Sequence, residues 1–266
     1  MRPLAVVTGA SSGIGLELAR QFAQNGFDLI IAAEDATINS APSSIAADGA
    51  RVEPVQVDLA TADGVEQLYA RIAASGRPVE AIAINAGIGV NGDFSRDTEL
   101  EAELRLIQLN VMSTVHLTKR VVKDMVARGR GRILITSSIA ALMPSPFMAV
   151  YGATKAFDLA FAESLREELK DSGVSVTALL PGPTETNFFR RADMEDTKAA
   201  ESSPENDPAE VARQGFKALM AGEERVIAAS LKTKFQGALA RFLPEQLKAK
   251  WHRALTEPGS ASSSSG

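Results

Sequence analysis

Short apolar runs alternate with longer amphipathic segments along most of this chain of 266 residues. The short runs are rich in Val, Ile, Leu and Ala, whereas the longer segments place apolar residues at helical spacing. The predicted strands are Leu4–Thr8, Asp28–Ala33, Val52–Val57, Ala81–Asn85, Arg132–Ser137, Val174–Leu180 and Arg225–Ala228. The predicted helices are Gly13–Asn25, Thr37–Ala47, Ala62–Ala74, Leu100–Ala127, Val150–Lys170 and Pro208–Met220.

This alternation predicts a doubly wound α/β fold with a seven-stranded parallel sheet flanked by helices. The length suits a single domain, which we place at residues 1–256 with a helical extension near 231–255. The Ser-rich residues 257–266 are expected to form a disordered tail. Ligands of such folds bind beyond the carboxyl ends of the strands, so the segments that follow the predicted strands are the place to look for chemistry.

Composition narrows the chemistry that is open to this chain. It has no Cys and only two His, His116 and His252, so we expect no disulfide, no thiolate nucleophile and no metal centre. A net charge of −5 gives no broad attraction to nucleic acid, which we exclude as a partner. Catalysis would therefore depend on hydroxyls, amines, carboxylates or an organic cofactor.

The first residues run directly into a predicted strand and lack the features of a signal peptide. No apolar run reaches the roughly 20 residues that a membrane-spanning helix needs. We therefore expect a cytoplasmic protein.

A glycine-rich turn, TGASSGIG, follows the first predicted strand and opens the first predicted helix. Glycines allow positive φ and let the backbone approach a pyrophosphate, whose charge is attracted by the N–H groups at the start of the helix. A glycine turn without any ligand is the alternative. The order of strand, turn and helix favours a Rossmann-type dinucleotide site, with contacts from Thr8, Gly9, Ser11, Ser12, Gly13, Ile14 and Gly15.

Two acidic residues, Glu34 and Asp35, end the second predicted strand. They lie about twenty residues after the glycine turn, where a dinucleotide site places an acid against the adenosine ribose. A pair of acids at the N-terminus of a helix is the alternative interpretation.

Three polar side chains in the second half of the chain are candidates for catalysis. Tyr151 and Lys155 are four residues apart on a predicted helix, so they share one face. Ser138 follows the fifth predicted strand, thirteen residues before Tyr151. Earlier in the chain, Asn110 interrupts the apolar face of a long predicted helix, where Asn is unfavourable unless solvent, a local hydrogen bond or a function explains it. Each residue has an ordinary structural explanation when taken alone, and only the conjunction points to a site.

The glycine turn and the spacing of Ser138, Tyr151 and Lys155 resemble those of short-chain dehydrogenases/reductases. The resemblance implies that Tyr151 is the catalytic acid and base, with its pKa lowered by Lys155. Lys155 would also hold the nicotinamide ribose, and Ser138 would bind the substrate oxygen. Asn110 would position a water molecule in a proton relay.

The resemblance extends to further cofactor contacts. Asp58, followed by Leu59, matches the position that bonds the adenine ring, and Asn85, Ala86 and Gly87 follow the fourth predicted strand. The loop with Pro181, Gly182, Thr184 and Thr186 resembles the loop around the nicotinamide, with Thr186 reaching its carboxamide. One departure is Ile84, which stands where the family usually has a second Asn.

These motifs predict an oxidoreductase that transfers a hydride between a nicotinamide cofactor and a carbonyl or secondary alcohol. The candidate pocket residues are predominantly apolar and favour a hydrophobic small molecule: Ile88, Ile139, Ala140, Leu142, Phe147, Met148 and Pro183. A catalytically silent dinucleotide-binding sensor or scaffold is the alternative. An epimerase or dehydratase of the same fold is a third, although those relatives are usually longer and have a different glycine spacing.

NAD is favoured over NADP as the cofactor. NADP carries an extra phosphate, and the positions that would bind it hold Ser12 and Glu34, with no base. The register leaves an alternative open, because NAD-preferring relatives usually have their acid at the position of Ala33. A shift of one residue along a strand turns the side chain to the opposite face, and both cofactors would then be accepted.

Three further segments suggest partners or motion. The long polar connection from Thr186 to Pro208 predicts a lid with a short helix near Phe188–Ala192. The helices at Leu100–Ala127 and Val150–Lys170 resemble those that form the family's homodimers or homotetramers; alternatively, they cover only the sheet. The stretch Leu231–Leu255 is basic and amphipathic and either packs on its own domain or contacts an anionic membrane surface.

Overall fold

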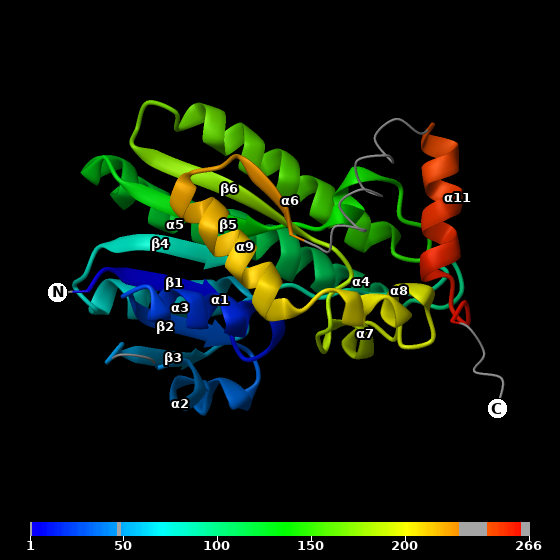
Figure 1. Ribbon diagram of the computed structural model, residues 1–266, viewed down its shortest axis with the longest axis horizontal. Coiled ribbons are helices and arrows are strands. Elements are labelled where there is room, and N and C mark those ends of the chain that lie inside the picture. The colour runs from blue at the N-terminus through cyan, green and yellow to red at the C-terminus, as the bar shows by residue number, and fades with distance from the viewer. Residues whose placement is uncertain (1, 47–48, 229–243, 262–266) are drawn as a thin grey trace.

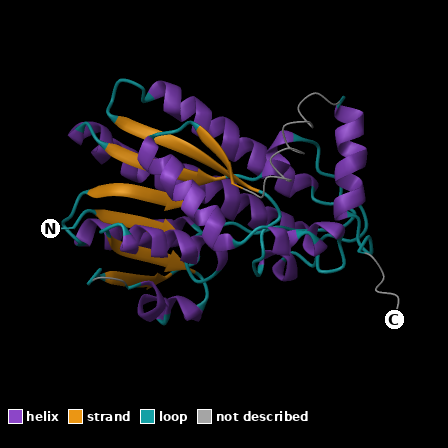
Figure 2. Ribbon diagram, in the orientation of Figure 1, coloured by secondary structure: helices purple, strands orange, loops and turns teal. Residues whose placement is uncertain are grey.

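The computed structural model describes residues 2–46, 49–228 and 244–261. Within these residues seven parallel strands form one sheet in the order β3-β2-β1-β4-β5-β6-β7 (Figure 1). Helices lie on both sides of this sheet, so the protein has three layers (Figure 2). The doubly wound fold predicted from the sequence is confirmed.

The strands lie close to their predicted positions. They are β1 Leu4–Thr8, β2 Asp28–Ala33, β3 Val52–Gln56, β4 Val79–Ile84, β5 Gly131–Thr136, β6 Val174–Pro181 and β7 Arg225–Ala228. The longer helices are α1 Gly13–Gln24, α3 Ala62–Ala74, α4 Leu100–Ile107, α5 Ser113–Arg128, α6 Ala149–Glu168, α9 Pro208–Ala221 and α11 Glu245–Thr256. The shorter helical segments are η1 Ala36–Asn39, α2 Ala41–Ile45, η2 Gln108–Met112, η3 Ile139–Leu142, α7 Phe188–Arg191, α8 Lys198–Glu201 and η4 Ser203–Glu205.

Two apolar layers hold the helices to the sheet. On one face α1, α2 and α9 pack together, and Phe22 of α1 makes an edge contact with Phe216 of α9 at 5.1 Å between ring centroids. On the other face α3, α5 and α6 bury residues such as Leu68, Leu117 and Leu159. The central strands are therefore buried on both faces, which explains why they appear in the sequence as continuous apolar runs.

The single helix predicted over Thr37–Ala47 is wrong. The carboxylate of Asp35 accepts a hydrogen bond from Thr37 N and starts the short turn η1. Pro42 then lies in the first turn of a separate helix, α2, where its missing N–H costs no hydrogen bond.

The long helix predicted over Leu100–Ala127 is interrupted. The segment η2 between α4 and α5 is a π-helical turn that contains Asn110. Such turns insert a residue into a helix and are frequent at functional sites. The interruption aims the Asn110 side chain at the loop that follows β4, as its hydrogen bonds show below.

The C-terminal part of the chain returns to the end of the sheet at which the strands finish. Helix α11 lies there beyond α7 and α8 (Figure 1), and Gly259 N donates a hydrogen bond to Asp196 Oδ2 at 2.6 Å. Residues 257–261, which the sequence assigned to a disordered tail, are therefore held against the loop before α8. Residues 229–243, the first half of the predicted basic stretch, and residues 262–266 lie outside the described residues. None of the helices that the structure describes has the length and hydrophobicity of a transmembrane segment.

The carboxyl ends of β1, β4 and β5 are tied together by side chains. The buried hydroxyl of Thr8 accepts hydrogen bonds from Asn85 N at 2.9 Å and Ala86 N at 3.0 Å. Asn85 Oδ1 accepts one from Thr136 Oγ1 at 3.1 Å. The N–H groups of Asn85 and Ala86, which follow β4, therefore have a hydrogen-bond acceptor that is not part of a neighbouring strand.

Thr8→Val tests this tie, because it leaves the N–H groups of Asn85 and Ala86 without an acceptor. Each orphaned group costs about 1–3 kcal/mol, so we expect the free energy of unfolding in urea to fall by about 2 kcal/mol or more. Thr8→Ser keeps the oxygen and removes one methyl group, so its loss should stay near 1 kcal/mol. Equal stability of the Val and Ser variants would contradict the tie.

Candidate active site

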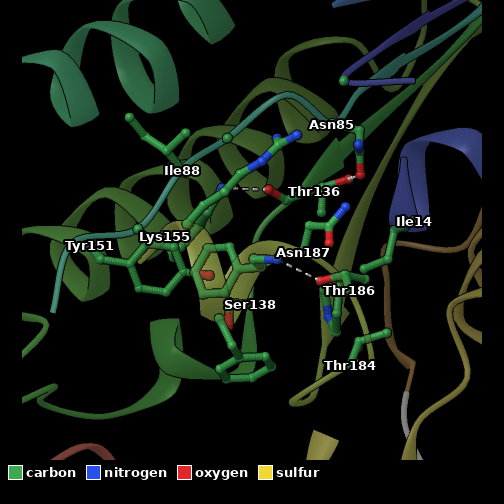
Figure 3. A pocket seen from close by; sticks show the side chains of 18 of the residues that line it. Ile14, Asn85, Ile88, Thr136, Ser138, Tyr151, Lys155, Thr184, Thr186 and Asn187 are labelled. Atoms are coloured by element: carbon green, nitrogen blue, oxygen red, sulfur yellow. Dashed lines mark hydrogen bonds between the residues drawn. The ribbon is translucent and has the colours of Figure 1, made fainter. Parts of the chain in front are cut away.

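A cavity of about 540 Å³ opens at the carboxyl ends of the strands and extends from the glycine loop to α11. Most of the residues predicted as site residues line it: Gly9, Ser11, Ser12, Gly13, Ile14, Gly15, Glu34, Asp58, Leu59, Asn85, Ala86, Gly87, Ser138, Tyr151, Lys155, Pro181, Gly182, Thr184 and Thr186. Figure 3 shows Tyr151, Lys155 and Ser138 on one side of this cavity and Ile14, Thr184 and Thr186 on the other. Thr8 and Asn110 are not among its lining residues and support the loops from behind.

The glycine loop has the shape that a pyrophosphate requires. Gly9 and Gly13 adopt φ values of 67° and 55°, which favour glycine. A Cβ at Gly15 would lie 2.1 Å from the Gly9 carbonyl, and one at Gly13 would lie 2.9 Å from Thr186 Cγ2. Ser12 precedes α1 without capping it through its side chain, so the N–H groups of the first turn stay open to an anion. The loop therefore fits a dinucleotide.

The adenosine end of this loop holds both acids and arginines. Arg105 of α4 bridges Glu34 Oε2 at 2.9 Å and Asp58 Oδ2 at 3.0 Å. Arg191 of α7 lies 3.7 Å from Asp35 Oδ2. The positions compared in the sequence hold no base, but these two arginines reach the same end of the site from elements far along the chain.

Asp35, rather than Glu34, faces the glycine loop. Ser11 Oγ donates a hydrogen bond to Asp35 Oδ2 at 2.6 Å, whereas the Glu34 carboxylate turns to Arg105. Burial alone would raise the pKa of Asp35, but the hydrogen bonds from Ser11 and Thr37 and the charge of Arg191 lower it overall. A carboxylate is thus kept ionised beside the place of the adenosine ribose.

Tyr151 and Lys155 project from α6 towards Ser138, as predicted. Lys155 is only 5% exposed, and its Nζ donates to the Thr136 carbonyl at 2.9 Å and to Asp158 Oδ2 at 3.0 Å. The ammonium lies 6.0 Å from the centre of the Tyr151 ring. Ser138 makes a hydrogen bond with Tyr151, and its Oγ accepts another from Ala140 N at 3.1 Å, which fixes the hydroxyl at the end of β5.

The pKa of Tyr151 lies above its ordinary value, against the expected direction. Burial raises the pKa most, and the negative charge of Asp158 adds to this. Lys155 and the hydrogen bond with Ser138 lower the pKa, as the sequence suggested, but by less than burial raises it. The sequence could not show how deeply the phenol is buried, nor that Asp158 lies beside Lys155.

Asn110 braces the site from behind. Its Oδ1 accepts a hydrogen bond from Ile88 N at 3.0 Å, and its Nδ2 donates to the Ile88 carbonyl at 3.0 Å and to Thr154 Oγ1 at 3.1 Å. The amide thereby joins the loop after β4 to α6. Its role in a water relay stays a prediction.

The nicotinamide loop follows β6 and leads directly into α7. Thr184 is buried and donates to the Gly182 carbonyl at 2.8 Å, so its hydroxyl shapes the loop. Thr186 Oγ1 accepts a hydrogen bond from Phe188 N at 3.2 Å, close to Gly13. The short helix predicted near Phe188–Ala192 is present as α7.

The description of the family model that matches residues 3–197 is "short chain dehydrogenase". The chain belongs to the short-chain dehydrogenase/reductase family. It is an NAD(P)-dependent oxidoreductase of that family.

Relatives and solved structures agree with this assignment. This chain is 37% identical, over 71% of its length, to a short-chain type dehydrogenase/reductase of Sinorhizobium fredii. The match covers 73% of that relative. A sulfoacetaldehyde reductase of Chromohalobacter salexigens is 30% identical over 71% of this chain and 75% of its own. The mycobacterial oxidoreductase EphD is 36% identical over 70% of this chain, which spans only 31% of that longer protein.

Three solved structures have the same fold. A Sphingobium yanoikuyae short-chain dehydrogenase in complex with NADPH has a TM-score of 0.78 and 30% identity, covering 91% of this chain and 96% of its own. A Brucella melitensis 3-ketoacyl-(acyl-carrier-protein) reductase with NADH has a TM-score of 0.76 and 25% identity, covering 87% and 98%. A Comamonas testosteroni alcohol dehydrogenase described as specific for bulky-bulky ketones has a TM-score of 0.72 and 26% identity, covering 91% and 99%.

The substrate end of the dehydrogenase/reductase is lined mainly by apolar side chains. Of the residues predicted for this pocket, Ile88, Ile139, Ala140, Met148 and Pro183 line the cavity, but Leu142 and Phe147 do not. The structure adds residues that sequence reasoning missed, among them Met143, Phe188, Met194, Trp251 and Leu255. Trp251 and Leu255 belong to α11, and nothing in the sequence links that helix to the pocket.

Specific contacts fix α11 over the cavity. Thr256 Oγ1 donates to the Pro146 carbonyl at 2.8 Å, and Asn91 Nδ2 donates to the Thr256 carbonyl at 2.9 Å. The Arg253 guanidinium lies 4.9 Å from the centre of the Phe147 ring. The described half of the predicted basic stretch thus packs on its own domain.

His252 of α11 lines the cavity and is 8% exposed. Burial lowers its pKa to about 4. The unfolded chain binds a proton at His252 at a higher pH than the folded protein does. The stability that depends on a neutral His252 is therefore complete above pH 6.5 and decreases as the pH falls towards about 4.

Acidification should therefore loosen α11. A pKa difference of this size corresponds to a loss on the order of 3 kcal/mol, and we expect the fluorescence of Trp251, the only Trp of the chain, to change between pH 7 and pH 5 before global unfolding. His252→Gln cannot be protonated and should abolish this transition. Identical profiles for the two proteins would show that another group causes it.

Proposed function

We propose that this protein transfers a hydride between a nicotinamide dinucleotide and the carbonyl or carbinol carbon of a bulky, hydrophobic substrate. The observation that carries the proposal is the position of Tyr151. Tyr151 lines the cavity that holds both the glycine loop and the apolar side chains, with Ser138 beside its phenol and the Lys155 ammonium 6.0 Å from its ring centre.

Each of these residues has its own role in the transfer. Ser138 and Tyr151 hold the substrate oxygen by hydrogen bonds, and Tyr151 gives it a proton in reduction or removes one in oxidation. Lys155 orients the cofactor ribose and stabilises the phenolate. The bound cofactor supplies or accepts the hydride. Because burial raises the pKa of Tyr151, oxidation of an alcohol, which needs the phenolate, should require a higher pH than reduction of a carbonyl.

The lining of the substrate end supports a bulky apolar ketone or alcohol. Phe188 lies 5.3 Å from the Tyr151 ring, and Met143, Trp251 and Leu255 extend the apolar wall. His252 is the titratable group on the described part of α11 that reaches this wall, and it is neutral above its pKa of about 4. The cations among the described lining residues, Lys155 and Arg191, lie beside Asp158 and Asp35 and not in this apolar wall. A bulky ketone, as for the Comamonas enzyme, therefore suits the described wall better than a charged substrate such as sulfoacetaldehyde.

Tyr151→Phe tests the reaction. It removes the acid and base but keeps the ring, so NAD(P)H absorbance assays over a panel of bulky ketones should show turnover reduced by about 10²-fold or more. Cofactor affinity, measured by titration calorimetry, should change little. Turnover close to that of the unsubstituted protein would refute the role of Tyr151. If the unsubstituted protein binds cofactor but converts no carbonyl or alcohol, a silent dinucleotide sensor replaces the proposal.

We also propose that the enzyme prefers NAD to NADP, with Asp35 as the selecting residue. Glu34, Asp35 and Asp58 outnumber Arg105 and Arg191 at the adenosine end, so that end keeps a net negative charge. An ionised Asp35 can accept hydrogen bonds from ribose hydroxyls and repels a phosphate in their place. The solved relatives include one structure with NADPH and one with NADH, so both cofactors occur on this fold.

Asp35→Ser should weaken this selection and still cap η1. A carboxylate about 4 Å from a phosphate charge costs about 1 kcal/mol in water and about 4 at an effective dielectric of 20. We therefore expect the ratio of kcat/KM for NADPH to that for NADH to rise at least about fivefold. Glu34→Gln should change the ratio less, because the Glu34 carboxylate already pairs with Arg105. A preference for NADPH in the unsubstituted enzyme would overturn the proposal.

Exposed apolar side chains support a homodimer or homotetramer. Leu100, Leu104 and Ile107 of α4 are exposed at helical spacing, and Phe157 of α6 is exposed as well. Exposed patches of this kind mark interfaces. Light scattering at micromolar concentration should therefore give a multiple of the chain mass, and Leu104→Glu should shift it towards the monomer. A monomeric unsubstituted protein would show that these helices cover only the sheet.

A further inference from the structure

A buried carboxylate next to Lys155 belongs to none of the motifs that identify the site. Asp158 lies on α6 one turn after Lys155, and only 1% of its surface is exposed. Its Oδ2 lies 3.0 Å from Lys155 Nζ, whereas its Oδ1 has no hydrogen-bond partner among the described residues. Burying a carboxylate is costly unless an opposite charge compensates it. Lys155 is the group that provides this compensation.

The ion pair also determines where the Lys155 ammonium points. Of its three N–H groups, one is directed to the Thr136 carbonyl and one to Asp158. A single N–H is left for the cavity, which Lys155 lines. A long, flexible side chain is thereby confined to one position without any ligand.

We propose that Asp158 is a positioning residue, whose carboxylate holds the Lys155 ammonium at the edge of the sheet and offsets part of the positive charge that Lys155 presents to Tyr151. Its effect on turnover rests on the proposed function. Its effect on Tyr151 itself does not, because the charge acts on the phenol with or without a substrate.

No other charged group of the described residues occupies the position of Asp158 beside Lys155. The segments η2, η3 and β6 carry no charged residue, and Arg132 of β5 alternates with Ile133 and Ile135, which face α6. The titratable groups of α4, which packs against α6, are Glu101, Glu103 and Arg105, with Glu99 immediately before the helix. The other titratable groups that line the cavity are Arg191 of α7, His252 of α11, and Glu34, Asp35 and Asp58 at the adenosine end. Among the charged groups of the described residues, only Lys155 and Asp158 act on the pKa of Tyr151.

The small number of tyrosines makes a direct test possible. The chain has two, Tyr69 and Tyr151, so in a Tyr69→Phe background the ultraviolet absorbance of tyrosinate reports Tyr151 alone. Asp158→Asn removes the negative charge and keeps the shape, so the ionisation midpoint of Tyr151 should fall by about one pH unit. An unchanged or raised midpoint would overturn the inference.

Asp28→Asn is the matched control. Asp28 is buried and forms an ion pair with the partly exposed Arg77 at 2.9 Å, but it begins β2 at the opposite end of the sheet. This variant also loses a buried carboxylate and some stability, and it should leave the Tyr151 midpoint where it was. A shift equal to that of Asp158→Asn would mean that the midpoint follows stability alone, which contradicts a specific role for Asp158.

A stability comparison covers the case in which Asp158→Asn does not fold. Lys155→Met leaves the Asp158 carboxylate buried without a counter-ion, so its melting temperature should fall. Adding Asp158→Asn to Lys155→Met removes the stranded charge and should raise the melting temperature again. A double variant that melts at or below the single variant would refute the pairing.

The pH dependence of turnover separates this inference from the proposed function. In Asp158→Asn the pH at which alcohol oxidation reaches half its maximum should fall in parallel with the Tyr151 midpoint. If the midpoint falls and the pH profile does not, Asp158 acts on Tyr151 as inferred and the assigned role of Tyr151 is wrong.

Discussion

The hydrogen bond from the Lys155 ammonium to the Thr136 carbonyl joins the two parts of the molecule that catalysis must bring together. On one side, Thr136 bonds to Asn85, and Asn85 bonds to Thr8, at the end of the strand that leads into the glycine loop. On the other side, α6 carries Tyr151 one turn before Lys155. The distance from the phenol to the glycine loop is therefore set by hydrogen bonds in which the side chains of Lys155, Thr136 and Thr8 take part, at one edge of the sheet. The sheet itself, buried on both faces, keeps this edge rigid.

Burial gives the charges at this edge their strength. Lys155 and Asp158 lie almost entirely out of water, where a charge acts on its neighbours more strongly than at the surface. Tyr151 is affected by both, and its pKa reflects their balance together with its own burial. At the adenosine end Glu34 and Arg105 are partly exposed, so solvent screens their interaction and their arrangement can adapt to a ligand.

How much the sequence revealed depended on how far apart the interacting residues are in the chain. The glycine turn and the pair Tyr151 and Lys155 were predictable because strand order and helical spacing fix such local patterns. Arg105 and Arg191 were missed because each reaches the adenosine site from a helix that no local pattern connects to β2. The break between η1 and α2 was missed because Pro42, which lies in the first turn of α2, starts a new helix inside the helical pattern. Asp158 is only three residues from Lys155, yet an acid three residues from a lysine on a helix is usually a solvated pair, and its burial appears only in the fold.

Helix α7 lines both halves of the cavity. Phe188 at its start contacts the Tyr151 ring, in the substrate half. Arg191 at its end lies near Asp35, in the adenosine half. Thr186, immediately before this helix, packs against Gly13 of the glycine loop. One turn of helix therefore supplies both the aromatic wall beside Tyr151 and a cation beside Asp35.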